Sequence, residues 1–240
     1  EQILFYGILC HSIARQFGLE EKRATVLTAA ALTANLALVP VADQLNASNT
    51  VLTDDQRAVI RKHPARSIQA LTSAGINNKL LLRIIAQHHE QADGSGYPEG
   101  LSGSDILPEA EILALAERYV AMITKRAYRN RMNITEARKL IATLADGKFR
   151  PAIPRSLLQI LGDHPPGMLV RLVNNEVGVV TRRADRTRGP FVKAIFGPRG
   201  NRYSGTFERD TSLLEYNIRA PEEPEIMPTM DFSMLWGFRS

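Results

Sequence analysis

Apolar residues recur at helical spacing through the first two thirds of the chain. The stretch 3–17 (ILFYGILCHSIARQF) shows this pattern and should end at Gly18, since glycine commonly stops helices. The stretch 21–39 is rich in Ala and Leu and apolar nearly all round, which predicts a buried helix that Pro40 ends. The sequence TDDQ at 53–56 is a capping box, which predicts the start of a further helix.

The helical pattern continues to residue 161. We expect the helix that starts at 53 to kink or restart at Pro64, and a following helix to lead into two adjacent histidines. A long amphipathic helix should follow Pro108, and shorter helices are expected at about 134–145 and 154–161. Residues 1–162 are therefore predicted to form a bundle of about seven helices.

A different pattern begins after a turn-rich segment at Gly162. Short runs with β-branched residues (MLVRLV, EVGVVTRR, PFVKAIF and SLLEYNI) alternate with turn signals such as Asn174-Asn175 and Gly197-Pro198. They predict a small antiparallel β domain over 168–220. Residues 221–240 have no usable period, and we expect a tail that is disordered or packed as an extended arm. The predicted fold class is mainly α, with a small C-terminal antiparallel β domain.

The composition, with 44% hydrophobic and 23% charged residues, is that of an ordinary globular protein. No apolar run approaches the roughly 20 residues of a membrane span, and no signal peptide is visible. We therefore expect a cytoplasmic protein without a membrane span, and a fragment of a longer chain because it starts at Glu1. The single Cys10 excludes an internal disulfide and should be a buried apolar residue. A net charge of +5 favours anionic ligands, nucleotides included.

The candidate chemistry lies in residues 84–101, IIAQHHEQADGSGYPEGL. Neighbouring helical side chains diverge by about 100°, so we do not expect His88 and His89 to chelate one ion side by side. Each could serve a different metal, or one could turn inward. The glycines allow positive φ, and Pro98 stiffens the loop exit. This stretch resembles the signature of the HD-GYP family of metal-dependent phosphohydrolases, His-His-Glu-x-x-Asp-Gly-x-Gly-Tyr-Pro, at every fixed position.

The resemblance covers about residues 8–155 and implies an HD-domain bundle with a metal centre that hydrolyses cyclic di-GMP. In such a centre, metal ions activate a water molecule and neutralise charge on the phosphate. The metal ligands that the resemblance implies are His11, His63, His88, His89 and Glu117. The substrate-binding residues that it implies are Arg126, Arg129, Asp93, Gly96, Tyr97 and Pro98. No catalytic residue is assigned.

The chain departs from the family at its namesake His-Asp pair. Leu32 and Thr33 stand at those places, Leu36 stands at the place of a lysine, and Glu117 stands where the family has an aspartate. Leu32 and Leu36 are one helical turn apart, so we expect a dry core at the place of the missing ligands. The resemblance is thus to a degenerate HD-GYP domain that holds one divalent transition metal (iron or manganese) or none.

Two functions follow from the resemblance. One is a catalytically impaired signalling domain that senses a cyclic dinucleotide or docks a protein partner through its GYP loop (residues 90–101). The alternative is an active metal-dependent phosphodiesterase that hydrolyses cyclic di-GMP. The β region is basic, yet a solvated hairpin is a simpler interpretation than a nucleic-acid surface, and we do not expect nucleic-acid binding. The basic residues concerned are Arg182, Arg183, Arg186, Arg188, Lys193, Arg199 and Arg202.

Overall fold

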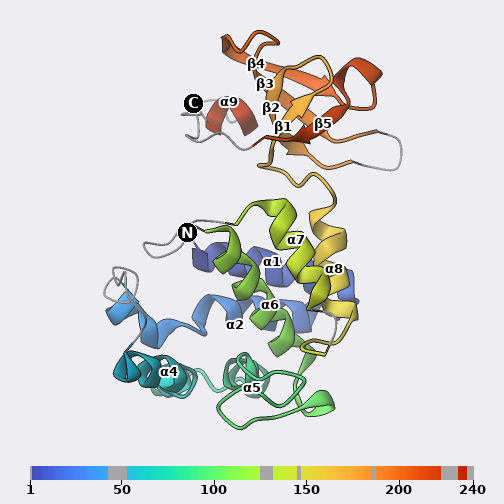
Figure 1. Ribbon diagram of the computed structural model, residues 1–240. Coiled ribbons are helices and arrows are strands. Elements are labelled where there is room, and N and C mark those ends of the chain that lie inside the picture. The colour runs from blue at the N-terminus through green and yellow to red at the C-terminus, as the bar shows by residue number, and fades with distance from the viewer. Residues whose placement is uncertain are drawn as a thin grey trace. The chain divides into compact units, whose positions relative to one another are not determined.

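The computed structural model describes residues 2–42, 53–124, 132–144, 147–184, 188–222 and 232–236. The chain divides into two compact units, Glu1–Ile160 and Leu161–Ser240. The first is helical and the second contains a five-stranded antiparallel sheet (Figure 1). The predicted fold class is confirmed.

The first unit is organised around one central helix, α6, against which α1, α2, α5 and α7 pack (Figure 1). Its core contains fully buried aliphatic side chains from these helices, among them Ile13, Leu27, Ile84, Leu115 and Ile141. The elements are α1 (Gln2–Phe17), α2 (Glu21–Thr33), the 3-10 helix η1 (Leu36–Val41), α4 (Asp54–Ser73), α5 (Lys79–Gln87), the 3-10 helix η2 (Gly103–Asp105), α6 (Pro108–Ile123), α7 (Ile134–Thr143) and α8 (Ala152–Leu161).

Local chemistry sets several helix ends as predicted. The Thr53 hydroxyl accepts a hydrogen bond from the Gln56 backbone N–H (3.2 Å), and the Gln56 side chain accepts one from the Thr53 N–H (2.9 Å). This reciprocal cap starts α4. Gly18 follows α1 with a φ of +91°, a conformation that a side chain would disfavour.

The predicted helix over 21–39 is wrong in its second half. The α-helix ends at Thr33, and a separate 3-10 helix, η1, includes Pro40. The helix is also buried on one side and not all round. Small residues such as Ala24 and Ala30 lie on that buried side. Leu32 and Leu36 are each 39% exposed, so the expected dry core at 32–36 is absent. Tertiary contacts made by Asn35, described below, coincide with this break.

The expectation that no apolar run approaches a membrane span is also wrong. Glu21–Val41 is long and apolar enough by length and composition, because its many Ala residues count as apolar and its Thr residues interrupt it weakly. The core helix of a folded domain passes the same test, so this is weak evidence for a span. Here α2 packs against α1, α5 and α6.

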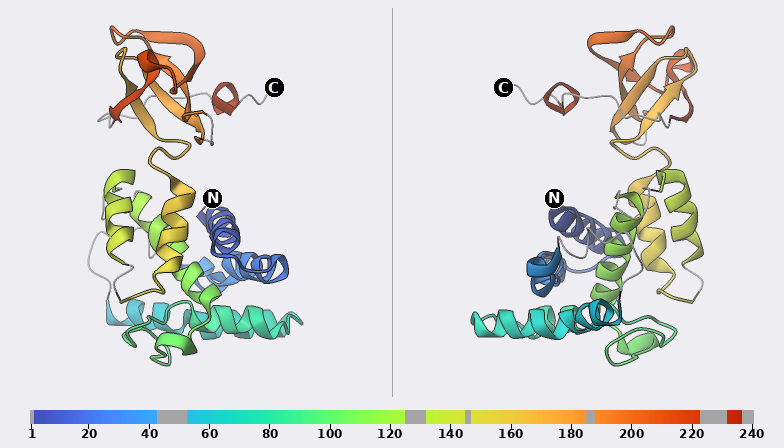
Figure 2. Two further views of the ribbon diagram at one scale, coloured as in Figure 1. Left: turned by 90° about the vertical axis from the view of Figure 1, so that its right-hand side faces the viewer. Right: turned by 60° about the vertical axis from the view of Figure 1, so that its left-hand side comes forward.

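The second unit has the strand order β4-β3-β2-β1-β5, with every neighbour antiparallel. Figure 2 shows the twist of this sheet. The strands are β1 (Leu169–Leu172), β2 (Val177–Arg182), β3 (Phe191–Phe196), β4 (Arg202–Asp210) and β5 (Ile218–Pro221). A short helix, α9 (Phe232–Trp236), contacts β2 and β4 and buries Leu235 with Val177, Val179 and Ile195.

The sequence pattern identified three of these strands and misplaced the rest. The run SLLEYNI forms mostly a 3-10 helix, η3 (Leu214–Tyr216), and only Ile218 begins β5. Strand β4 was missed because it is an edge strand with mostly half-buried or exposed residues, so it needs few apolar side chains. The turn signal Asn174-Asn175 is confirmed, since Asn175 adopts a φ of +68° between β1 and β2.

Candidate metal centre

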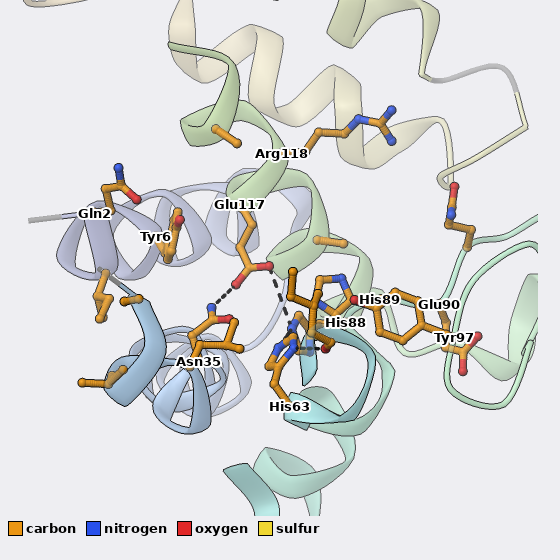
Figure 3. Close-up of a pocket in the computed structure, with 18 of the residues that line it drawn as sticks. Gln2, Tyr6, Asn35, His63, His88, His89, Glu90, Tyr97, Glu117 and Arg118 are labelled. Carbon is orange, nitrogen blue, oxygen red and sulfur yellow. Dashed lines mark hydrogen bonds and ion pairs between the residues drawn. The ribbon is translucent and has the colours of Figure 1, made fainter. Parts of the chain in front are cut away.

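A cavity of about 610 Å³ opens in the helical unit where the predicted histidines meet. Its walls come from α1, η1, α4, the end of α5, the GYP loop and α6 (Figure 3). One side is polar, with His63, His88, His89, Asn35 and Glu117. The other lining residues are largely apolar, for example Ile3, Leu38 and Val39.

Pro64 determines how His63 presents its ring. Proline lacks the backbone N–H that would bond to the Ile60 carbonyl four residues earlier, yet α4 runs through it without ending. His63 Nδ1 donates to that free carbonyl instead, at 2.6 Å. A carbonyl oxygen only accepts, so the proton lies on Nδ1 and Nε2 carries a lone pair. No new helix starts at Pro64, because α4 is continuous, and the His63 side chain replaces the missing hydrogen bond.

His88 is fixed in the same way at the end of α5. It caps the helix, where carbonyls of the last turn lack intrahelical donors. Its Nδ1 donates to the Ile85 carbonyl at 2.7 Å, which again leaves a lone pair on Nε2. Metal-binding histidines typically use their second nitrogen in this manner.

The two lone pairs face each other, with Nε2 of His63 and Nε2 of His88 only 3.3 Å apart. Burial, the largest cause in each case, lowers the pKa of both rings to about 4, which disfavours a proton between them at neutral pH. Two metal–nitrogen bonds of about 2.1 Å at a tetrahedral angle would separate the nitrogens by roughly 3.4 Å. The pair therefore fits a shared cation.

His89 completes a group of three histidines whose ligand atoms all lie within 4.8 Å of one another. Adjacent histidines are not expected to chelate one ion side by side, yet His88 and His89, which follow the end of α5 at Gln87, both contribute ligand atoms to this group. The rings of His88 and His89 are 4.0 Å apart between centroids. Tyr97 stacks on His89 at 4.7 Å, and Arg61 lies 5.1 Å above the Tyr97 ring.

Glu117 supplies a carboxylate beside this group. Its Oε2 lies 3.9 Å from His88 Nε2, while its Oε1 accepts a hydrogen bond from the Asn35 side-chain amide at 2.5 Å (Figure 3). Burial is the main cause that raises the Glu117 pKa to about 7. A carboxylate that is costly to ionise gains from a nearby cation. The described donors, three imidazoles and one carboxylate oxygen, suit a divalent transition metal.

The rest of the signature holds the GYP loop onto the histidines. Glu90 is buried and accepts hydrogen bonds from the backbone N–H groups of Glu99 (2.7 Å) and Leu101 (2.9 Å). Gly96 lies so close to residues 89–91 that an added Cβ would come within 2.4 Å of the Glu90 Cα. The Tyr97 N–H donates to the His89 carbonyl (3.1 Å), which places the Tyr97 ring against His89.

The structure does not bring every predicted residue to the cavity. His11 approaches Thr28 Oγ1 (3.4 Å) and Glu21 Oε1 (3.8 Å), and it belongs neither to the described histidine group nor to the described lining. Of the predicted loop residues, Tyr97 lines the cavity, whereas exposed Asp93 accepts hydrogen bonds from Ser95 and Pro98 is exposed. Arg126 and Arg129 lie outside the described residues.

Asn35 and Arg118 are among the cavity residues to which the sequence interpretation gave no role. Asn35 is a single amide within a long Ala- and Leu-rich run, and such an isolated polar residue was the available signal. Arg118 gave no comparable signal in the sequence, because an exposed arginine on an amphipathic helix is ordinary. Cys10 is fully buried as expected, and burial raises the pKa of its thiol.

Comparison with known proteins relates this chain to one family. The model of the HD domain family matches residues 6–153. A cyclic di-GMP phosphodiesterase of Pseudomonas aeruginosa is 30% identical over 189 residues, which cover 78% of this chain and 45% of that protein. The cyclic di-GMP phosphodiesterase PdeB of Borreliella burgdorferi is 24% identical, with 72% of this chain and 46% of that protein covered. The chain thus spans less than half the length of these two relatives.

Solved structures share the fold. An HDGYP-type protein of Bdellovibrio bacteriovorus superposes with a TM-score of 0.55 at 24% identity, covering 67% of this chain and 51% of that one. A cyclic GMP-AMP specific phosphodiesterase of Vibrio cholerae gives a TM-score of 0.52 at 15% identity, covering 68% and 44%. With a family match over more than half its length, the chain belongs to the HD domain family and is a distant relative of the HD-GYP cyclic di-GMP phosphodiesterases.

Proposed function

We propose that this chain is an HD-GYP-type receptor domain that binds a cyclic dinucleotide over a single-metal centre and has little or no phosphodiesterase activity. The observation that carries this proposal is the way the Glu117 carboxylate is held. Only one oxygen of this carboxylate faces the histidines, because the other accepts from Asn35. To bridge two ions through both of its oxygens, Glu117 would have to turn Oε1 away from Asn35.

The places of the missing His-Asp pair give no replacement ligand. The Thr33 hydroxyl donates to the Ala29 carbonyl inside α2, at 2.8 Å. Leu32 lies against Gly7 of α1, where an added Cβ would meet the leucine at 3.2 Å. The described donors therefore favour one ion held by His63, His88, His89 and Glu117. A single ion acts as a Lewis acid on a phosphate oxygen when bound, without a second ion to share an activated water.

The ligand class comes from the relatives and the cavity. The matched proteins of Pseudomonas aeruginosa and Borreliella burgdorferi are named as cyclic di-GMP phosphodiesterases. A cavity of about 610 Å³ is within the common range for small-molecule sites. Tyr97 is held flat against His89, so this aromatic wall is fixed before a ligand arrives.

The test combines metal analysis, binding and turnover on the purified chain. After loading with Mn²⁺ and removal of free ion, we expect one equivalent per chain by elemental analysis. Calorimetry should detect cyclic di-GMP binding, and chromatography should detect no linear dinucleotide or GMP above a His89→Ala control. Two metal equivalents, or no cyclic di-GMP binding, would contradict the proposal.

An active phosphodiesterase is the second candidate. It is favoured by the retained group of His63, His88 and His89 with Glu117 beside it. Robust hydrolysis of cyclic di-GMP that disappears in His89→Ala would decide for this candidate. Binding with one ion and no turnover would decide for the receptor.

A further inference from the structure

Arg118 gives the cavity a positive charge. It follows Glu117 on α6, is exposed, and is the one Lys or Arg among the described lining residues. Figure 3 shows that the two side chains leave the helix in different directions: Glu117 points toward Asn35 and His88, and Arg118 extends away from them. Neighbouring positions on a helix diverge by about 100°, which produces this arrangement.

No described carboxylate neutralises Arg118. Other arginines of the helical unit are engaged, as Arg23 is with Glu109 (2.6 Å) and Arg150 with Glu111 (2.7 Å). Within the described part of the chain, Arg118 makes no hydrogen bond or ion pair. The acids of the cavity wall have other partners, since Glu90 binds loop N–H groups and Glu117 binds Asn35. The guanidinium therefore keeps its donors for a ligand.

We propose that Arg118 binds a phosphate group of the cyclic dinucleotide, an inference that rests on the proposed function. Such a ligand carries two phosphates. The histidine centre addresses one of them, and Arg118, which extends away from the histidines, binds the other. A guanidinium matches two phosphate oxygens with parallel N–H donors, which a lysine does not. Arg118 would thus provide a cation in a cavity where Leu36 stands at the place of the family's lysine.

The experiment measures cyclic di-GMP binding by calorimetry on the Mn²⁺-loaded chain and on three variants, together with their metal content. Arg118→Leu removes the charge, and Arg118→Lys keeps the charge without the planar fork. Arg66→Leu is the matched control, because Arg66 is exposed on α4 and does not line the cavity. We expect Arg118→Leu to weaken binding about 10- to 100-fold, Arg118→Lys to fall between it and the unchanged chain, and Arg66→Leu to bind normally.

Metal content should be the same in all four proteins. If the unchanged chain binds cyclic di-GMP and Arg118→Leu binds equally well, the inference is overturned while the proposed function stands. If the unchanged chain binds no cyclic di-GMP, both fail. Loss of the metal from Arg118→Leu would also overturn the inference, because the defect would then lie in the metal centre.

Discussion

Asn35 decides which way the Glu117 carboxylate points beside the histidine group. Its amide donates to Glu117 Oε1 and leaves Oε2 toward His88. The Glu117 side chain is one methylene longer than the aspartate at this place in the family. A hydrogen-bond partner such as Asn35 therefore helps to fix its orientation. Groups that orient metal ligands in this way commonly contribute 10- to 100-fold to metal affinity.

We expect Asn35→Ala to weaken Mn²⁺ binding by about tenfold or more, since Glu117 would lose its restraint. Competition with a chromophoric chelator measures this affinity. Leu38→Ala is a suitable control, because it enlarges the same cavity without removing a polar contact. Equal affinity in Asn35→Ala and the unchanged chain would mean that Glu117 does not depend on Asn35, or that it is not a ligand.

At the level of elements, Glu176 connects the start of β2 to strand β4. It is buried and accepts hydrogen bonds from Arg209 Nε and Nη2 (both 2.8 Å), from the Tyr203 hydroxyl (2.7 Å) and from the Asn174 amide (3.0 Å). The Arg209 hydrogen bonds are the largest cause that lowers the Glu176 pKa to about 2. The edge strand is therefore held by an ionised group.

This pKa predicts an acid-sensitive C-terminal unit. A carboxylate whose folded pKa lies below its unfolded value stabilises the fold above pH about 4.5, and this contribution is lost as the pH falls toward about 2. The full loss amounts to roughly 3 kcal/mol in the free energy of unfolding, of which about 2 kcal/mol is lost between pH 6 and pH 3. Urea unfolding at pH 6 and pH 3 measures it, with fluorescence of Trp236, the single tryptophan, as the reporter on this unit.

Glu176→Gln serves as the comparison. Its glutamine cannot ionise, so the variant should be less stable at pH 6 and should lose less stability between pH 6 and pH 3 than the unchanged chain. An identical pH dependence in both proteins would show that other groups control the acid response.

At the scale of the whole molecule, the histidine centre and Trp236 belong to different units. Metal binding stabilises what it binds, by about 2.7 kcal/mol at a free concentration a hundred times the dissociation constant. We expect Mn²⁺ to raise the thermal midpoint seen by far-ultraviolet circular dichroism, which follows the helices, and to leave the Trp236 fluorescence transition unchanged. Chelation should reverse the shift. A common shift of both signals would mean that the two units unfold as one cooperative block.

Sequence reasoning identified the helical unit, the antiparallel β unit and the signature loop because periodicity, capping residues and turn glycines are local signals. It failed where a distant contact decides the conformation. The break after Thr33 coincides with a hydrogen bond from Asn35 to Glu117, which lies 82 residues further along the chain. The approach of His88 and His89 to His63 follows the end of α5, which helical periodicity alone does not locate to a single residue.

The close packing of Gly96 has a consequence for how this signature is interpreted in other chains. Glu90, Gly96 and Tyr97 fasten the loop to the backbone of residues 89–91, so these positions are needed for the local fold whether or not a reaction takes place. A genome search that uses the signature alone would therefore select chains by the fold of this loop and not by a complete set of metal ligands. The side chains at 32 and 33, at the end of α2, and at 35, just before η1, would have to be compared as well.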